Sequence, residues 1–86
     1  MWKSISFVKR GKIRRKVVSY LMAGPATPTD IAKKTGQHRP SISRALIELE
    51  EKKLVECLTP DEKLGRIYRV SKKGKDVFGK LEKLDA

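Results

Sequence analysis

The chain has 86 residues, of which 38% are hydrophobic, and it carries 21 Lys and Arg against 10 Asp and Glu, a formal net charge of +11. This length holds one small domain with one modest core and is too short for a cofactor fold or a second lobe, which argues against an enzyme. No apolar run approaches the roughly 20 residues that cross a bilayer, the N-terminus has no signal-peptide segment, and a single cysteine cannot form an internal disulfide. We therefore expect a soluble, reduced, cytoplasmic protein that does not bind membranes.

The positive charge is concentrated near the N-terminus. Residues 1–29 contain seven Lys or Arg and no acidic residue, so they carry +7 of the net charge. A positive surface of this size attracts polyanions, which include nucleic acid, anionic membranes and acidic proteins. The charge alone does not distinguish among these partners.

The first third of the chain predicts one clear helix. Residues 1–7 alternate only weakly, and we expect an arm or a short strand there. Between residues 9 and 23, Ile13, Val17 and Leu21 follow helical spacing, and a Gly-Pro pair ends the element. Its Lys and Arg residues fall mostly on the other faces, which either meet solvent or contact phosphates.

Two more helices follow in close succession. Thr29 is placed to cap a short helix over residues 30–35, and Gly36 ends it. A third helix, from about residue 39 to 53, has four apolar residues on one face, Ile42, Ala45, Leu46 and Leu49. Two helices joined by a Gly-containing turn form a helix-turn-helix.

The last third predicts a hairpin and a final helix. Segments 55–58 and 66–70 are rich in β-forming residues and are separated by a seven-residue loop. Ser71 can cap the last helix, which carries an apolar stripe of Val77, Phe78, Leu81 and Leu84. Such a stripe near a chain end either covers the core or pairs with a second copy. The order is helix, helix, helix, strand, strand, helix, an α+β arrangement that is mainly α.

This series resembles the winged helix-turn-helix core of ArsR-type and MarR-type transcriptional regulators, and most of all small stand-alone archaeal members. PTDIAKKTG at residues 28–36, SISRALIELEEKKLV at 41–55 and GRIYRVSKKG at 65–74 carry the resemblance. It covers roughly residues 9–84. It implies a single domain over residues 1–86 with its core at 8–84, a recognition helix at 39–53 and a wing at 59–66.

The recognition helix supplies the candidate base contacts. With its apolar face turned inward, helical geometry places Pro40, Arg44 and Ile47 on the far side. A helix fits the DNA major groove, where Arg bonds guanine bidentately and Ser bonds either base type. The candidates are Arg39, Pro40, Ser41, Ser43 and Arg44, with Arg44 leading. The alternative for each arginine is a solvated side chain without a partner.

The candidate phosphate contacts come from three regions, and their members are Lys12, Arg14, Arg15, Thr29, Gln37, His38, Lys63 and Arg66. Gln37 and His38 have the alternative of shaping the turn or capping the helix. In the wing, Asp61 and Glu62 partly cancel the basic charge, which weakens the case for deep minor-groove insertion. Ile47 is apolar where the periodicity predicts solvent, and a thymine methyl contact, a partner surface or a slight helix rotation would each explain it.

We expect no cofactor and no metal site. Cys57 and His38 each stand alone, whereas a transition-metal site needs several ligands, and there is no Gly-rich phosphate loop or catalytic set. A homodimer is expected through the last helix, with Val77, Phe78, Leu81 and Leu84 at its interface.

The leading hypothesis is a sequence-specific regulator of transcription that binds double-stranded DNA. The alternatives are a nonspecific basic protein of nucleic acid or chromatin, and a winged-helix module that docks on protein or RNA.

Overall fold

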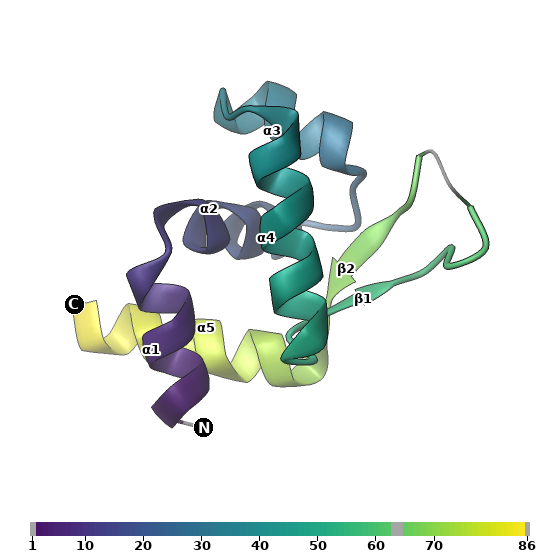
Figure 1. Ribbon diagram of the computed structural model, residues 1–86. Helices are drawn as coiled ribbons and strands as arrows, with labels where there is room; N and C mark the ends of the chain where they lie inside the picture. The colour runs from purple at the N-terminus through teal and green to yellow at the C-terminus, as the bar shows by residue number, and fades with distance from the viewer. Residues whose placement is uncertain (1, 63–64, 86) are drawn as a thin grey trace.

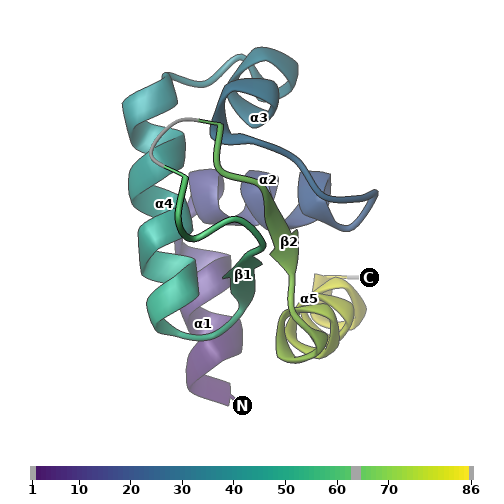
Figure 2. The ribbon, with the colours of Figure 1, turned by 90° about the vertical axis from the view of Figure 1, so that its right-hand side faces the viewer.

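The computed structural model describes residues 2–62 and 65–85, and it is mainly helical with one small hairpin, as predicted (Figure 1). In chain order the elements are α1 (Trp2–Arg10), α2 (Lys12–Leu21), α3 (Pro28–Thr35), α4 (Arg39–Glu51), β1 (Val55–Cys57), β2 (Tyr68–Val70) and α5 (Lys72–Asp85). In Figure 2 the wing hairpin lies beside α4, and α5 is seen end-on at the other side of the sheet. Among the described residues no helix is both long and apolar enough to cross a membrane.

The prediction of an arm or short strand over residues 1–7 is wrong, because residues 2–10 form α1. The single helix predicted from residue 9 is divided at Gly11, whose extended backbone (φ −103°, ψ 107°) separates α1 from α2. Ile5 and Val8, three residues apart on one side of α1, are both buried in the core. This helical spacing, and not the weak alternation, determines the conformation of the segment.

The cap of α3 is Thr27 and not Thr29, which lies inside the helix. The Thr27 hydroxyl accepts a hydrogen bond from the Asp30 backbone N–H at 3.1 Å, and the Asp30 carboxylate accepts one from the Thr27 N–H at 3.4 Å. This reciprocal pair needs a spacing of three residues, which Thr27 has and Thr29 lacks. Gly36, in the left-handed region at φ 70°, ends the helix as predicted.

The apolar stripe of α5 lies in the core of the same chain. Val77 and Leu81 are 1% and 0% exposed, and Phe78 is 8% exposed. These side chains therefore have almost no surface to offer a second copy, and the dimer interface predicted for them is not available while the core is intact. Leu84, the fourth member of that prediction, has a side chain outside the described ones.

The hairpin is shorter than predicted, with β1 and β2 antiparallel and Val55 opposite Val70. Tyr68 also pairs with Ala26, whose backbone it meets in both directions at 2.9 and 3.0 Å. The segment before α3 is thereby attached to the edge of the sheet. This connection joins the segment that leads into the helix-turn-helix to the second strand of the wing.

The end of α4 is attached to the start of α5. The Ser71 hydroxyl accepts a hydrogen bond from the Gly74 N–H at 3.0 Å, which confirms Ser71 as the cap, and donates one to the Lys53 carbonyl at 2.7 Å. A side-chain carbon at Gly74 would collide with the Leu54 carbonyl and press on a methyl group of Val70. The close approach of α5 to this junction therefore requires glycine.

We expect Gly74→Ala to lower the free energy of unfolding by about 1–3 kcal/mol, because the added methyl group has rigid backbone in its way. Gly79→Ala in the same helix is the matched control, since nothing lies within 4 Å of its added carbon. That control should raise the free energy of unfolding by about 0.5–1 kcal/mol. Urea denaturation of both variants measures the difference, and equal effects would contradict the close approach.

Candidate nucleic-acid interface

The site is built on α4, which buries one face and exposes the other. Ile42, Leu46 and Leu49 are no more than 1% exposed, and they hold the helix in a single rotational setting. Pro40, Arg44 and Ile47 are exposed on the far side, as the periodicity predicts. The helix therefore presents a defined outer face.

Charge is divided along α4. Its first half carries Arg39 and Arg44 and no acidic residue, whereas Glu48, Glu50 and Glu51 lie in its second half. No side chain caps its N-terminus, and the His38 carbonyl accepts the first backbone hydrogen bonds, from the N–H groups of Ser41 and Ile42. The positive end of the helix dipole adds to the two arginines. An anionic ligand is thus favoured at the N-terminal half alone.

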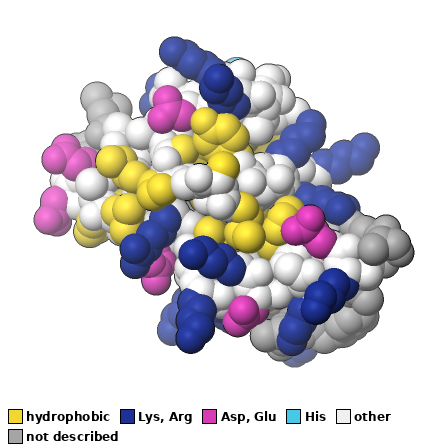
Figure 3. Space-filling model, turned by 180° about the vertical axis from the view of Figure 1, so that it is seen from behind, with side chains coloured by type: hydrophobic (Ala, Val, Ile, Leu, Met, Phe, Trp, Pro, Cys, Tyr) yellow, Lys and Arg dark blue, Asp and Glu magenta, His cyan; other side chains and the backbone are white. Residues whose placement is uncertain are grey.

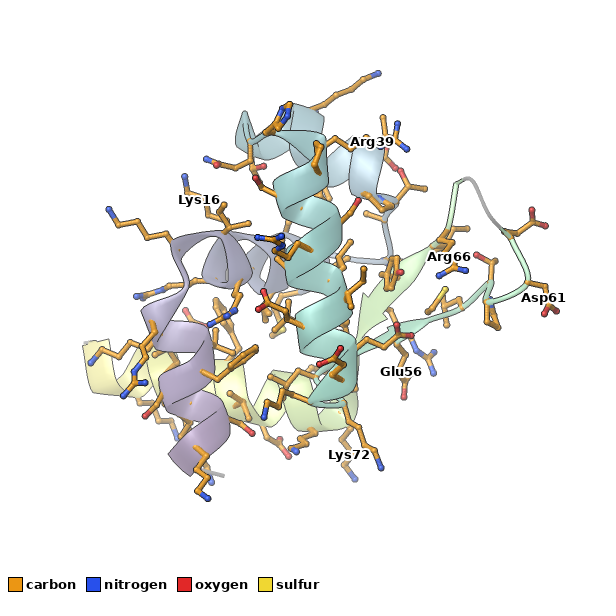
Figure 4. The ribbon with its side chains drawn as sticks, viewed as in Figure 1. Lys16, Arg39, Glu56, Asp61, Arg66 and Lys72 are labelled. Carbon is orange, nitrogen blue, oxygen red and sulfur yellow. The ribbon has the colours of Figure 1, made fainter. Side chains whose placement is uncertain are left out.

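Two grooves flank α4. The wing-side groove lies between α4, the start of α3 and the wing, and is lined by Pro28, Thr29, Arg39, Ser43, Ile47, Gly65, Arg66 and Tyr68. The α2-side groove lies against the junction of α1 and α2, and is lined by Arg10, Gly11, Lys12, Ile13, Arg14, Pro40, Ser41, Arg44, Ala45 and Glu48. Figure 4 shows Arg39 and Arg66 on the wing side of α4 and Lys16 on the opposite side.

The structure distributes the predicted base contacts over both flanks. Arg39 and Ser43 line the wing-side groove, and Pro40, Ser41 and Arg44 line the α2-side groove. Neither arginine has a hydrogen bond or ion pair to the described part of the chain. Both guanidinium groups are therefore free to bind a ligand.

Arg14 does not belong with the phosphate contacts predicted for the first helix. Its guanidinium donates to the Phe7 carbonyl and to the Glu48 carboxylate, each at 3.0 Å, and stacks 3.8 Å from the centre of the Phe7 ring. Its side chain is only 23% exposed. Arg14 instead joins α1, α2 and α4, because its planar fork satisfies two acceptors and one ring at once.

The other predicted phosphate contacts of the first third differ in their settings. Lys12 is exposed at the first position of α2 and lines the α2-side groove, and Thr29 lines the wing-side groove. Arg15 is half-buried and lines a hollow between α2 and α5 together with Lys12. Gln37 and His38 lie in the turn that precedes α4.

In the wing, Arg66 is held at the base of the loop. Its Nε donates to the Glu62 carbonyl at 2.6 Å, and a hydrogen bond with the Tyr68 side chain raises the pKa of the guanidinium above its ordinary value. Like any arginine, it is charged over the physiological pH range. Lys63 lies outside the described residues. Asp61 is exposed and points away from α4 at the outer side of the wing (Figure 4).

Arg10 is a candidate that the sequence did not single out. It stands at the last position of α1 and lines the α2-side groove with Lys12 and Arg44. Its position depends on the division of the first helix at Gly11, and the glycine between two basic runs is the sequence feature that could have indicated this division.

Tyr68, by contrast, is buried, where it packs in the core and forms a hydrogen bond with Arg66.

The rest of the described surface shows no comparable grouping of basic residues and no metal site. On the face opposite α4, basic side chains are mixed with acidic and apolar ones (Figure 3). Within the described residues no group of three or more His, Cys, Asp or Glu is placed to hold a metal ion. Cys57 is a free thiol at the end of β1, partly buried against the core.

Residues 2–86 match the family described as the HVO_A0261 N-terminal domain. The chain belongs to this family. A comparison with curated proteins gives no match.

Several solved structures superpose on this chain. A mutant of MarR from E. coli in complex with operator DNA superposes with a TM-score of 0.76 at 23% identity, over 93% of this chain and 59% of that one. A mutant of MepR from S. aureus bound to an oligodeoxyribonucleotide gives 0.76 at 20%, over 96% and 65%. A mutant of ZitR from Lactococcus lactis gives 0.74 at 16%, over 85% and 51%.

The fold is therefore the winged helix-turn-helix of MarR-type regulators, which confirms the predicted resemblance at the level of fold. The chain spans between about half and two thirds of the length of these three proteins.

We expect Arg14→Ala to lower the free energy of unfolding by about 1–3 kcal/mol, because it leaves the Phe7 carbonyl and the Glu48 carboxylate without their shared donor. Arg44→Ala is the control, an exposed arginine on α4 whose loss should change the free energy by less than about 0.5 kcal/mol. Thermal and urea unfolding of the two variants test the assignment. If the two variants had similar free energies of unfolding, Arg14 would be an ordinary surface cation and not a structural link.

Proposed function

We propose that the chain binds double-stranded DNA in a sequence-specific manner and regulates transcription. The observation that carries the proposal is the exposed N-terminal half of α4 with cationic residues in the grooves on both of its flanks. A helix that enters the major groove has a sugar-phosphate strand on each side. Cations on one flank alone would suit other polyanions equally well.

In the proposed complex, each flank of α4 has its own phosphate contacts. Arg10 and Lys12 face the strand on the α2 side, and Thr29 and Arg66 face the strand on the wing side. These contacts position the helix without reading sequence.

Base recognition then falls to the outer face of α4. Arg44 and Arg39 have guanidinium groups without partners in the described part of the chain, and each can bond O6 and N7 of guanine bidentately. Ser41 and Ser43 add hydroxyl groups on either side. Glu51 is exposed on the same face near the end of the helix, where it repels phosphate and limits contact to the first turns.

Relatives in structure are consistent with this function. The MarR and MepR mutants with this fold were solved with operator DNA and an oligodeoxyribonucleotide. The same fold also suits a nonspecific basic protein, for which the net charge of +11 would be sufficient. The ratio of specific to random affinity separates the two candidates.

The deciding experiment selects bound duplexes from a randomised pool at near-physiological salt and compares the selected sequence with a scrambled one. We expect at least about a thousandfold preference for the selected sequence. A palindrome would show that two copies bind together on adjacent half-sites. Tight binding without enrichment would identify a nonspecific protein, and no binding would contradict the proposal.

We expect Arg44→Ala to weaken binding to the selected duplex by about 1–3 kcal/mol and to leave binding to the scrambled duplex nearly unchanged, because it removes a base contact. Fluorescence anisotropy titrations on both duplexes measure the effect. Equal losses on the two would place Arg44 on phosphate.

Lys12→Ala should weaken binding to every duplex and reduce the slope of log affinity against log salt by about 1, because one phosphate contact releases about one counterion. Lys72→Ala is the matched control, an exposed lysine at the start of α5, which lies near the C-terminal end of α4 and away from its N-terminal half (Figure 4). A salt slope that changes equally in both variants would remove Lys12 from the interface.

A further inference from the structure

Ile47 is an exposed aliphatic side chain that no packing contact requires. It is 54% exposed, the most of the large hydrophobic side chains in the described part of the chain. The buried face of α4 fixes the rotation of the helix, so the exposure of Ile47 does not come from a rotated helix. Another purpose has to be sought on the outer face.

The surroundings of Ile47 differ from those of an ordinary surface residue. It lies in the wing-side groove, a concavity of about 180 Å³, whose described polar lining consists of hydroxyl and guanidinium groups from Thr29, Ser43, Arg39, Arg66 and Tyr68. No carboxylate is among the described residues that line this groove. The groove therefore combines one aliphatic surface with hydrogen-bond donors and positive charge.

Ser43 and Ile47 are four residues apart, so they are neighbours along the outer face of α4. Together they present a hydroxyl group and an aliphatic group side by side. In the major groove thymine presents its O4 acceptor next to its C5 methyl group, and no other DNA base carries both. Cytosine has an amino donor in place of O4 and a hydrogen in place of the methyl.

We infer that Ile47 is a specificity-determining residue that reads the methyl group of a thymine, with Ser43 at the O4 atom of the same base. This inference rests on the proposed function and names the base that its site recognises. The neighbouring guanidinium of Arg39 then falls on an adjacent base or phosphate. One exposed aliphatic side chain can cover a methyl group, whereas docking a helix of a partner protein needs a far larger surface.

The test removes only the methyl group. Each thymine of the selected duplex is replaced in turn by deoxyuridine, which keeps O4, and binding is measured for the unaltered protein and for Ile47→Ala. For the unaltered protein we expect one position, or its symmetric pair, at which the replacement weakens binding about three- to tenfold, the effect of losing one buried methyl contact. For Ile47→Ala the same replacement should have no effect.

Met22→Ala is the matched control, because Met22 is also an exposed hydrophobic residue, 40% exposed at the end of α2, and it is not among the residues that line the groove. This variant should keep the full response to deoxyuridine. Near-ultraviolet circular dichroism and unfolding curves establish that all three proteins are folded.

Three outcomes separate the possibilities. A methyl response that disappears in Ile47→Ala and persists in Met22→Ala supports the inference. A selected sequence with no methyl response, or with one that survives in Ile47→Ala, overturns the inference and leaves the proposed function intact. If no sequence is selected at all, the proposed function itself fails and this inference fails with it.

Discussion

The rotational setting of α4 is the constraint on which the rest of the structure depends. Ile42, Leu46 and Leu49 are buried on one side, so the opposite side carries Arg44 and Ile47 whatever the ligand. A turn of the helix by one residue would expose a leucine and bury a charged group, at a cost of several kcal/mol. The wing, α2 and the turn before α4 then need only place cations beside a helix whose outer face is already determined.

Much of this arrangement is readable from local sequence. The apolar spacing of α4, the Gly36 turn, the Ser71 cap and the hairpin depend on residues close together in the chain, and each was predicted. The outer face of α4 follows from the same periodicity, which is why the structure places Pro40, Arg44 and Ile47 where the sequence indicated.

What could not be predicted depends on distant contacts or on competition between neighbours. Arg14 and Glu48 are 34 residues apart, and nothing in the local sequence distinguishes Arg14 from the other Lys and Arg residues of α2. Thr27 and Thr29 are both reasonable caps, and the position of Asp30 decides between them. Among the described side chains of α1, Ile5 and Val8 are the two that are buried in the core, too few to establish a periodicity. By sequence, the apolar stripe of α5 could either cover the core or pair with a second copy. Which of the two it does depends on how much of the core the other helices leave uncovered.

The contact made by Arg14 also determines what holds the N-terminal segment in place. α1 has nine residues and no acidic residue in its first turn, whereas an isolated helix needs about 12–15 residues to be stable in water. It is helical because Ile5 and Val8 pack on the core and because its Phe7 carbonyl and ring are held by the same guanidinium that pairs with Glu48 of α4. Arg14 thus links α1 to α4 mechanically. A pulling force applied to the chain before α1 would therefore reach α4 through this contact.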